Sequence, residues 1–237
     1  MIVAGVIAPH GEMDRAPATR AAMEELGRRV ARTEPEALVV VTPHNVHVER
    51  HFAVVVSARV GAREVDRGLA AAVLAELRSR GLEAVAVSFG GNDPAEAAMP
   101  IDWGVEVPLA FLPEVPVVVV SPARDRRLEE HVSAGVAIAA ASGERRIAVV
   151  ASADHGHAHS ADGPYGFDPA AAEYDERVLA AVREGRLSSL LELADLAARA
   201  RADSLWQLLV LQGAIGDRPL EVLSYEVERY YGMMVAC

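Results

Sequence analysis

Short runs of hydrophobic residues, many of them β-branched, alternate along the chain with longer stretches in which hydrophobic residues recur every three or four positions. A run that is hydrophobic throughout is typical of a strand buried on both faces, whereas the longer period is typical of an amphipathic helix. The runs predict strands at residues 2–8, 37–42, 52–58, 83–89, 115–121, 146–153, 219–228 and 231–236. The periodic stretches predict helices at residues 17–34, 65–80, 125–142, 169–184, 187–200 and 203–214.

This alternation predicts the α/β class, with a mostly parallel central sheet flanked by helices on both faces. A chain of 237 residues is long enough for one domain of this kind with a large core. Residues 90–104 are rich in glycine, proline and aspartate, and we expect them to form a loop. No repeat or linker interrupts the pattern, so residues 1–237 are expected to form a single domain.

The composition narrows the choice of partners. A net charge of −11 disfavours nucleic acid and anionic membrane surfaces, which leaves small molecules, metal ions and proteins. All 23 basic residues are arginine, which excludes Schiff-base chemistry on a lysine. The only cysteine, Cys237, cannot form a disulfide within the chain, which suits a reducing compartment. The chain shows neither a signal peptide nor an apolar run of the ~20 residues that span a bilayer, so we expect a cytoplasmic protein.

Histidines follow three of the predicted strands. His10 follows the first strand, His44 follows the second, and "ASADHGHAHSADGPYGFD" places His155, His157 and His159 after a third. In open α/β sheets, ligands bind beyond the carboxyl ends of the strands. A lone histidine there is more often a turn or capping residue, but three such positions together indicate one shared site. The remaining histidines, His47, His51 and His131, are interpreted as ordinary polar positions, with His131 facing solvent from a helix.

These histidines suggest a transition-metal site, because neutral imidazole binds iron, zinc, copper and nickel. Two histidines and one carboxylate with open coordination positions form the facial triad of non-haem iron(II) oxygenases. Glu12, Asp154 and Glu226 are the candidate carboxylates, and the residues alone do not decide among them.

An ordered set of short motifs resembles a known family across most of the chain. The chain is similar to the catalytic B-type subunit of class III extradiol ring-cleavage dioxygenases and to the related Memo-like proteins. The motifs that carry the resemblance are "IAPHGE", "VVVTPHNVH", "IDWGVEVPLAFL", "ASADHGH", "PYGFDPAAAEYDERV" and "LSYEVERYYGMMVA".

The resemblance implies a catalytic domain that opens a catechol-type aromatic ring with O2. It implies that His10, His44 and Glu226 bind Fe(II), with Mn(II) or Zn(II) as alternative metals, and that His157 is the acid/base residue. It gives no role to His155 or His159. Some family members carry a small partner subunit as a separate chain, and the apolar elements of this chain could also support a homodimer.

One position departs from the family pattern. Trp103 stands where the third motif commonly has a histidine beside the metal. Trp103 and Tyr165 are candidate walls for a flat aromatic substrate, and simple packing is the alternative for each.

Two other functions stay open. The "HGH" and "HAH" pairs would also suit a zinc-dependent hydrolase, although such pairs usually end the first strand of a barrel, and no eight-fold βα repeat is seen. A non-enzymatic, Memo-like metal-binding or regulatory protein is the second alternative, and Trp103 favours it.

Overall fold

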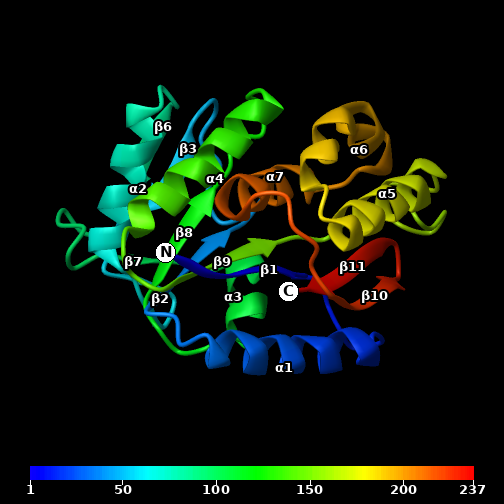
Figure 1. Cartoon of the computed structure of the whole chain (residues 1–237), viewed down its shortest axis with the longest axis horizontal. Helices are drawn as coiled ribbons and strands as arrows, with labels where there is room; N and C mark the ends of the chain where they lie inside the picture. Colours follow the sequence, from blue (N-terminus) through cyan, green and yellow to red (C-terminus); the bar gives the residue numbers. More distant parts are fainter.

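The computed structural model describes residues 1–237 and shows an α/β fold built on an eight-stranded central sheet (Figure 1). The strand order is β10-β11-β1-β9-β2-β8-β3-β6. The central strands are β1 (Ile2–Ala8), β9 (Ile147–Ser152), β2 (Ala37–Val41) and β8 (Val117–Ser121), and they run parallel to one another. The fold therefore confirms the prediction of a mostly parallel sheet with helices on both faces.

The strands at the two sides give the sheet its mixed character. On one side, β11 (Tyr231–Ala236) pairs antiparallel with β1 and with β10 (Val222–Glu228). On the other side, β3 (Phe52–Val55) runs antiparallel to β8 and parallel to β6 (Ala84–Val87). A small second sheet contains β4 (Arg59–Val60), β5 (Arg63–Glu64) and β7 (Ala98–Met99).

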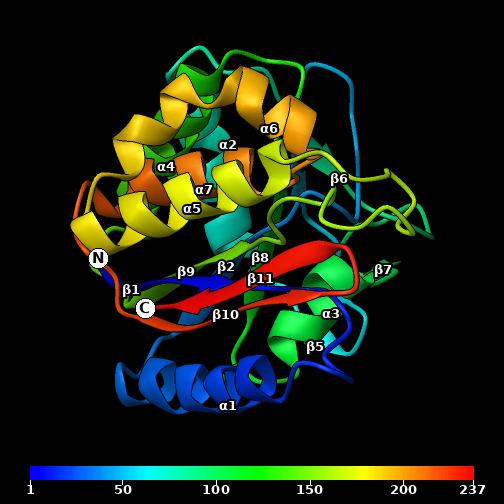
Figure 2. The same cartoon turned by 90° about the vertical axis from the view of Figure 1, so that its right-hand side faces the viewer.

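Helices cover the two faces of the central sheet unequally (Figures 1 and 2). One face carries α1 (Pro17–Arg32) and α3 (Trp103–Leu109). The other carries α2 (Arg67–Ser79), α4 (Leu128–Ser142) and α7 (Leu205–Ile215), with α5 (Ala170–Glu184), the 3-10 helix η1 (Leu187–Glu192) and α6 (Ala194–Ala200) beyond α7. None of these helices has the length and apolar character needed to cross a membrane.

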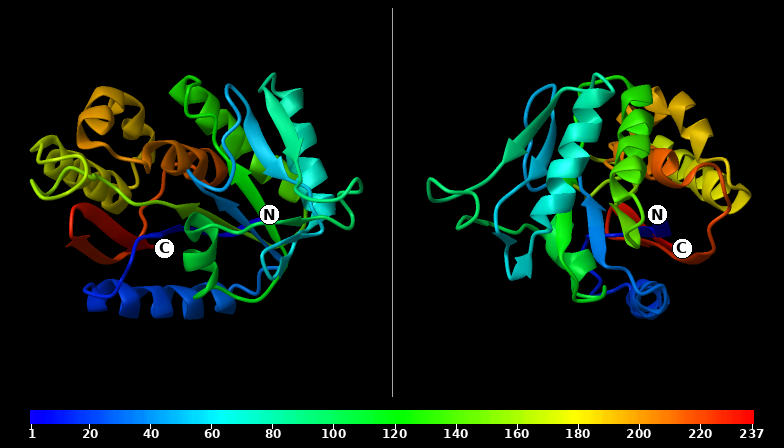
Figure 3. Two further views of the ribbon diagram at one scale, coloured as in Figure 1. Left: turned by 180° about the vertical axis from the view of Figure 1, so that it is seen from behind. Right: turned by 60° about the vertical axis from the view of Figure 1, so that its left-hand side comes forward.

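The core forms where the helices meet the central strands. Every residue of β2, β8 and β9 is buried, which explains why these strands appear in the sequence as uninterrupted hydrophobic runs. The views from behind and from the side show the same layers, with the sheet lying between its helices (Figure 3).

The fold also corrects several sequence predictions. The predicted loop at 90–104 contains β7 and the first residues of α3, and the predicted helix at 187–200 is divided into η1 and α6. The strand predicted at 52–58 ends at Val55. Two-residue strands carry too little periodicity to be recognised, and α3 contains Pro108, which disguises its helical pattern.

Candidate metal centre and cavity

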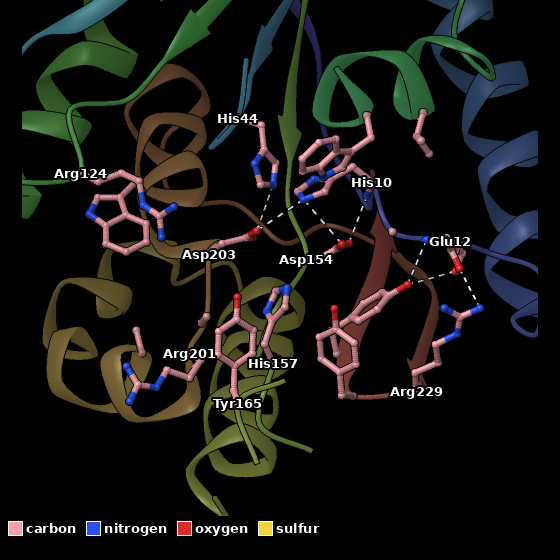
Figure 4. A pocket seen from close by; sticks show the side chains of 18 of the residues that line it. His10, Glu12, His44, Arg124, Asp154, His157, Tyr165, Arg201, Asp203 and Arg229 are labelled. Carbon is pink, nitrogen blue, oxygen red and sulfur yellow. Dashed lines mark hydrogen bonds and ion pairs between the residues drawn. The ribbon is translucent and has the colours of Figure 1, made fainter. Parts of the chain in front are cut away.

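The carboxyl ends of four neighbouring strands meet at one edge of the sheet. His10 follows β1, Asp154 follows β9, His44 follows β2 and Arg124 follows β8. A fifth residue, Asp203, comes from the short connection between α6 and α7. All five side chains line one cavity of about 890 Å³, whose size is typical of a small-molecule site (Figure 4).

Two histidines converge on a single carboxylate. The distances to Asp203 Oδ2 are 3.4 Å from His10 Nε2 and 3.6 Å from His44 Nε2. The candidate ligand atoms of the three residues all lie within 4.8 Å of one another, and the two imidazole rings are perpendicular, with centroids 4.9 Å apart. Three ligands gathered from three separate loops form the kind of cluster that holds a metal ion.

The tautomer of neutral His10 follows from its neighbours. Ser152 Oγ donates its only proton to the carbonyl oxygen of Gly104 at 2.6 Å, and it lies 2.9 Å from His10 Nδ1. The hydroxyl must therefore accept a hydrogen bond from His10 Nδ1–H. In the neutral ring this leaves the lone pair of Nε2 directed at the cluster, as a metal ligand requires.

Gly104 lies close to Thr42 and His44 because it has no side chain. A Cβ atom at this position would collide with Thr42 Oγ1 and would approach the His44 side chain to 3.1 Å. The first turn of α3 therefore packs directly against the loop that carries His44, and this contact brings the Gly104 carbonyl oxygen to Ser152.

The donor set of the cluster fits a divalent transition metal. Asp203 Oδ1 is buried and has no hydrogen-bond partner, which is costly for a carboxylate oxygen unless a cation is bound nearby. Two imidazole nitrogens and one carboxylate also match the facial triad, which leaves positions open for substrate and oxygen.

Burial and neighbouring charges shift the pKa values of His10 and Asp203 in opposite directions. Burial by itself lowers the pKa of His10, but the charges of Asp154 and Asp203 outweigh it and raise this pKa to about 9. Burial by itself raises the pKa of Asp203, but His10 and His44 bring it well below its usual range. Without a metal, the cluster therefore holds a proton on His10 and a negative charge on Asp203.

Asp154 orients His10 without belonging to the three-residue cluster. Its Oδ1 accepts a hydrogen bond from the His10 backbone N–H at 3.1 Å, and its Oδ2 lies 3.6 Å from His10 Nε2. Asp154 is buried, so its charge acts on His10 with little screening by water.

His157 presents a free ring nitrogen to the cavity. Its Nδ1 lies 2.7 Å from the carbonyl oxygen of His155 and must donate to it, which leaves Nε2 unprotonated in the neutral ring. The ring stacks on Tyr231, with centroids 5.6 Å apart, and meets Tyr165 edge-on at 6.0 Å. Figure 4 shows His157 across the cavity from the cluster.

His155 is buried behind the cavity wall and does not line it. Its Nδ1 lies 3.0 Å from Ser204 Oγ, and its Nε2 has no hydrogen-bond partner. Burial lowers the pKa of His155, which keeps the ring neutral.

His159 belongs to a separate buried network centred on Asp175. Asp175 Oδ2 lies 2.8 Å from His159 Nε2 and accepts a hydrogen bond from the Tyr225 hydroxyl at 2.7 Å. Asp175 Oδ1 accepts a hydrogen bond from the Gly156 backbone N–H at 2.7 Å. This network fixes the loop on either side of His157, which gives His159 a structural role.

The two predicted aromatic walls both line the cavity. Trp103 is 55% exposed and Tyr165 is 56% exposed, so neither is a core residue in this structure. The ring centroid of Trp103 lies 4.7 Å from that of His44. Packing in the core therefore does not account for either side chain.

The structure does not bring Glu226 to the cluster, which corrects the predicted ligand set. The Glu226 carboxylate accepts hydrogen bonds from the backbone N–H and the hydroxyl of Thr19, at 2.6 and 2.7 Å. It thereby satisfies one backbone N–H group in the first turn of α1, where a negative charge is favourable. Glu12, another candidate carboxylate, forms an ion pair with Arg229 at 2.7 Å instead.

The remaining histidines lie outside the cavity. His47 is exposed and His51 is half-buried, in line with their interpretation as polar positions. The prediction that His131 faces solvent is wrong: the side chain is fully buried in α4 against Phe52. Burial lowers the pKa of His131 to about 4, so this histidine stays neutral in the core.

Asp203 is the functional candidate that the sequence did not reveal. It precedes α7, and an aspartate before a helix is an ordinary capping residue. No sequence signal distinguishes it, because its position beside His10 and His44 depends on how the α6–α7 connection packs against the ends of β1 and β2.

The fold and the site define an α/β protein with a candidate metal centre in a cavity at the carboxyl ends of its parallel strands. The chain belongs to the family described as the catalytic LigB subunit of aromatic ring-opening dioxygenase, whose family model matches residues 4–236. This match confirms the resemblance seen in the sequence.

A solved structure has a fold similar to that of this chain. The chain is similar to an uncharacterized protein, JW3007, from Escherichia coli K12, with a TM-score of 0.67 and 19% identity over 98% of each chain. At this identity the likeness shows the fold alone. Among curated proteins, no significant match to the chain was found.

Proposed function

We propose that this protein is a non-haem iron(II)-dependent extradiol dioxygenase that opens the ring of a catechol-type substrate with O2. The observation that carries the proposal is the convergence of His10, His44 and Asp203 on one point of a cavity that His157 also lines. The family match adds independent support, since its members are described as subunits of aromatic ring-opening dioxygenases.

The three cluster residues would hold the metal. Fe(II) is the proposed ion, and Mn(II) or Zn(II) would suit the same donors. When bound, the metal would supply coordination positions for the catechol oxygens and for O2, and a route for electrons between them. Ser152 keeps the Nε2 lone pair of His10 available, and Asp154 holds the backbone of the same residue.

His157 would move the protons. Nε2 of the neutral ring can accept a phenolic proton from the substrate, because Nδ1–H is committed to the His155 carbonyl oxygen. The same nitrogen can return that proton later in the reaction, since histidine serves as both acid and base near neutral pH.

Aromatic side chains would place the ring between these two groups. Trp103 lies against His44 on the metal side, and Tyr165 lies against His157 on the proton-transfer side. A flat substrate between them would displace water from the cluster.

The decisive experiment is anaerobic reconstitution with Fe(II), followed by oxygen uptake with a panel of catechols. We expect one O2 consumed for each ring opened and a coloured ring-opened product. An iron-loaded protein that consumes no oxygen with any member of the panel would contradict the proposal.

A non-enzymatic, Memo-like metal-binding role is the second candidate. Trp103 favours it, because its indole ring occupies space beside His44 where many family members have a proton-handling histidine. Stoichiometric metal binding without oxygen uptake is the result that would support this alternative.

The zinc hydrolase alternative loses its main support. It relied on the alternating histidines binding one metal together, whereas His155 and His159 contact Ser204 and Asp175 respectively.

A further inference from the structure

Arg124 is a cation in the cavity wall that has no acidic partner. It follows β8, is half-buried and lines the cavity beside the candidate metal centre. No residue of the chain forms a hydrogen bond or an ion pair with its side chain, although the negative charge of Asp203 acts on it from a distance. Burial lowers the pKa of Arg124, but a guanidinium group stays charged at any physiological pH.

An aromatic ring holds Arg124 in place while leaving its N–H groups free. The guanidinium carbon lies 4.1 Å from the centroid of the Trp206 ring, a cation–π contact that uses the flat face of the group. The planar edge with its N–H donors is therefore available for a ligand. In Figure 4 the side chain extends towards Asp203, so this edge lies on the metal side of the cavity.

The other arginines of the cavity differ from Arg124. Arg229 is neutralised by Glu12, with an N–O distance of 2.7 Å. Arg201 is exposed, and Figure 4 shows it directed away from the cluster. Arg124 is thus the arginine of the cavity that is partly shielded from water and whose N–H groups form no hydrogen bond or ion pair.

We propose that Arg124, held against Trp206, binds a carboxylate group of the substrate, so that the preferred substrate is a catechol that carries a carboxylate. This inference rests on the proposed ring-opening function. A carboxylate matches the donor edge of a guanidinium group, because two parallel N–H···O bonds can form at once. The two hydroxyls of the catechol would face the His10, His44 and Asp203 cluster, and the carboxylate would face Arg124.

The test compares pairs of substrates that differ only in charge. One pair is 3,4-dihydroxybenzoate and 4-methylcatechol, and the other is 2,3-dihydroxybenzoate and 3-methylcatechol, which covers both ring positions. The wild-type protein should prefer the acid of at least one pair. Arg124→Gln should lower kcat/KM for that acid by about 10- to 100-fold, as for a lost charge-assisted hydrogen bond, and should change the methyl partner by less than about 3-fold.

Two further variants separate charge from packing. Arg124→Lys retains the charge but not the planar pair of donors, so its kcat/KM for the acid should fall between wild type and Arg124→Gln. Arg127→Gln is the matched control: it alters an arginine three residues along whose side chain is 78% exposed, and it should leave both members of the pair unchanged.

Binding provides a readout that does not depend on turnover. Calorimetry under anaerobic conditions, with and without iron, should show that 3,4-dihydroxybenzoate or 2,3-dihydroxybenzoate binds wild type about 10- to 100-fold more tightly than Arg124→Gln. Bound iron and the melting temperature should match in the two proteins. If Arg124→Gln melts well below wild type, Arg124→Lys takes its place in both assays. A kcat/KM and an affinity for the acid that equal those of wild type would then count against the proposal.

The outcomes distinguish this inference from the proposed function. Oxygen uptake that is equally fast with acids and methylcatechols, and is unaltered in Arg124→Gln, overturns the inference and leaves the dioxygenase proposal standing. Arg124-dependent carboxylate binding without oxygen uptake retains the anion site and overturns the dioxygenase proposal.

Discussion

His10 and His44 turn their Nε2 atoms towards one carboxylate, whereas the three histidines of residues 155–159 face three different environments. The first two are 34 positions apart in the chain, and the other three are separated by single residues. Distance along the sequence is therefore a poor guide to which histidines act together. The sheet determines this, because β1 and β2 flank β9 and release their chains at the same edge.

The loop after β9 disperses its histidines because it is not a regular strand. Its strand-like pairing is limited to isolated bridges, between Asp154 and Met233 and between His159 and Phe167. In a flat strand, residues 155, 157 and 159 would share one face. Here His157 reaches the cavity, while Ser204 and Asp175 hold the two neighbouring histidines.

The largest effect is expected from removing a proposed metal ligand. His44→Ala and Asp203→Ala should each lower iron affinity by more than the 10- to 100-fold typical of supporting residues, and should abolish ring opening. Glu226→Gln should retain stoichiometric iron, because Glu226 contacts Thr19 and not the cluster. Iron content by metal analysis checks all three. Full iron in Asp203→Ala, or its loss in Glu226→Gln, would refute the revised ligand set.

The next largest effect is expected at His157, in the loop after β9. His157→Gln should bind iron normally and should lower kcat by about 10²- to 10⁴-fold, the usual range for a positioned acid or base. Steady-state oxygen uptake measures the loss. His47→Gln, which alters an exposed histidine, is the control and should behave as wild type. An unchanged kcat in His157→Gln would remove this residue from the proposed mechanism.

A smaller effect is expected from the network that supports the loop. Asp175→Asn removes a buried charge that accepts hydrogen bonds from Gly156 and Tyr225 and lies beside His159. Its free energy of unfolding should fall by about 3 kcal/mol. Tyr225→Phe removes one hydrogen bond and should cost about 1 kcal/mol. Urea denaturation measures both, and equal stabilities in the two variants would contradict the central position of Asp175.

The smallest effect is expected in the pH dependence of stability of the metal-free protein, to which His10 and His155 contribute with opposite signs. The pKa of His10 is raised from 6.5 to about 9, so its stabilising contribution is present below pH 6.5 and is lost as the pH rises to about 9. The pKa of His155 is lowered, so stability falls as the pH drops below 6.5, where the unfolded chain binds the proton more readily.

Urea denaturation of metal-free protein between pH 5 and 9 tests these signs. His10→Asn should flatten the alkaline limb, and His155→Asn should flatten the acid limb. Metal binding at neutral pH should also release the proton held by His10, so metal affinity should rise with pH. Alkaline limbs of equal slope in wild type and His10→Asn would disprove the assignment to His10.

Much of the fold could be predicted from the sequence, because buried parallel strands must be hydrophobic at every position. Those of β2, β8 and β9 are the clearest examples. The short strands β4, β5 and β7 could not be predicted, since two residues define no period. The burial of His131 was also hidden, because it depends on packing against Phe52 from a distant strand.

The candidate site was partly predictable for the same physical reason. His10 and His44 stand directly after hydrophobic strands, so the rule for strand ends locates them. Asp203 comes from a connection between helices, where no strand-end rule applies and the residue resembles a helix cap. Glu226 was assigned as a ligand through the family resemblance, yet in the structure Thr19 of helix α1 is its partner.

The strand order sets how far apart the loops that line the cavity begin. Neighbouring strands are about 4.8 Å apart, and the chain leaves β1, β9, β2 and β8 in that spatial order. The candidate metal centre spans the first three of these strands, and Arg124 lies one strand further along. Under the two proposals above, metal binding and substrate choice would depend on separate loops. Substitutions in the loop after β8 would then change which substrate is bound while the residues proposed to hold the metal stay in place.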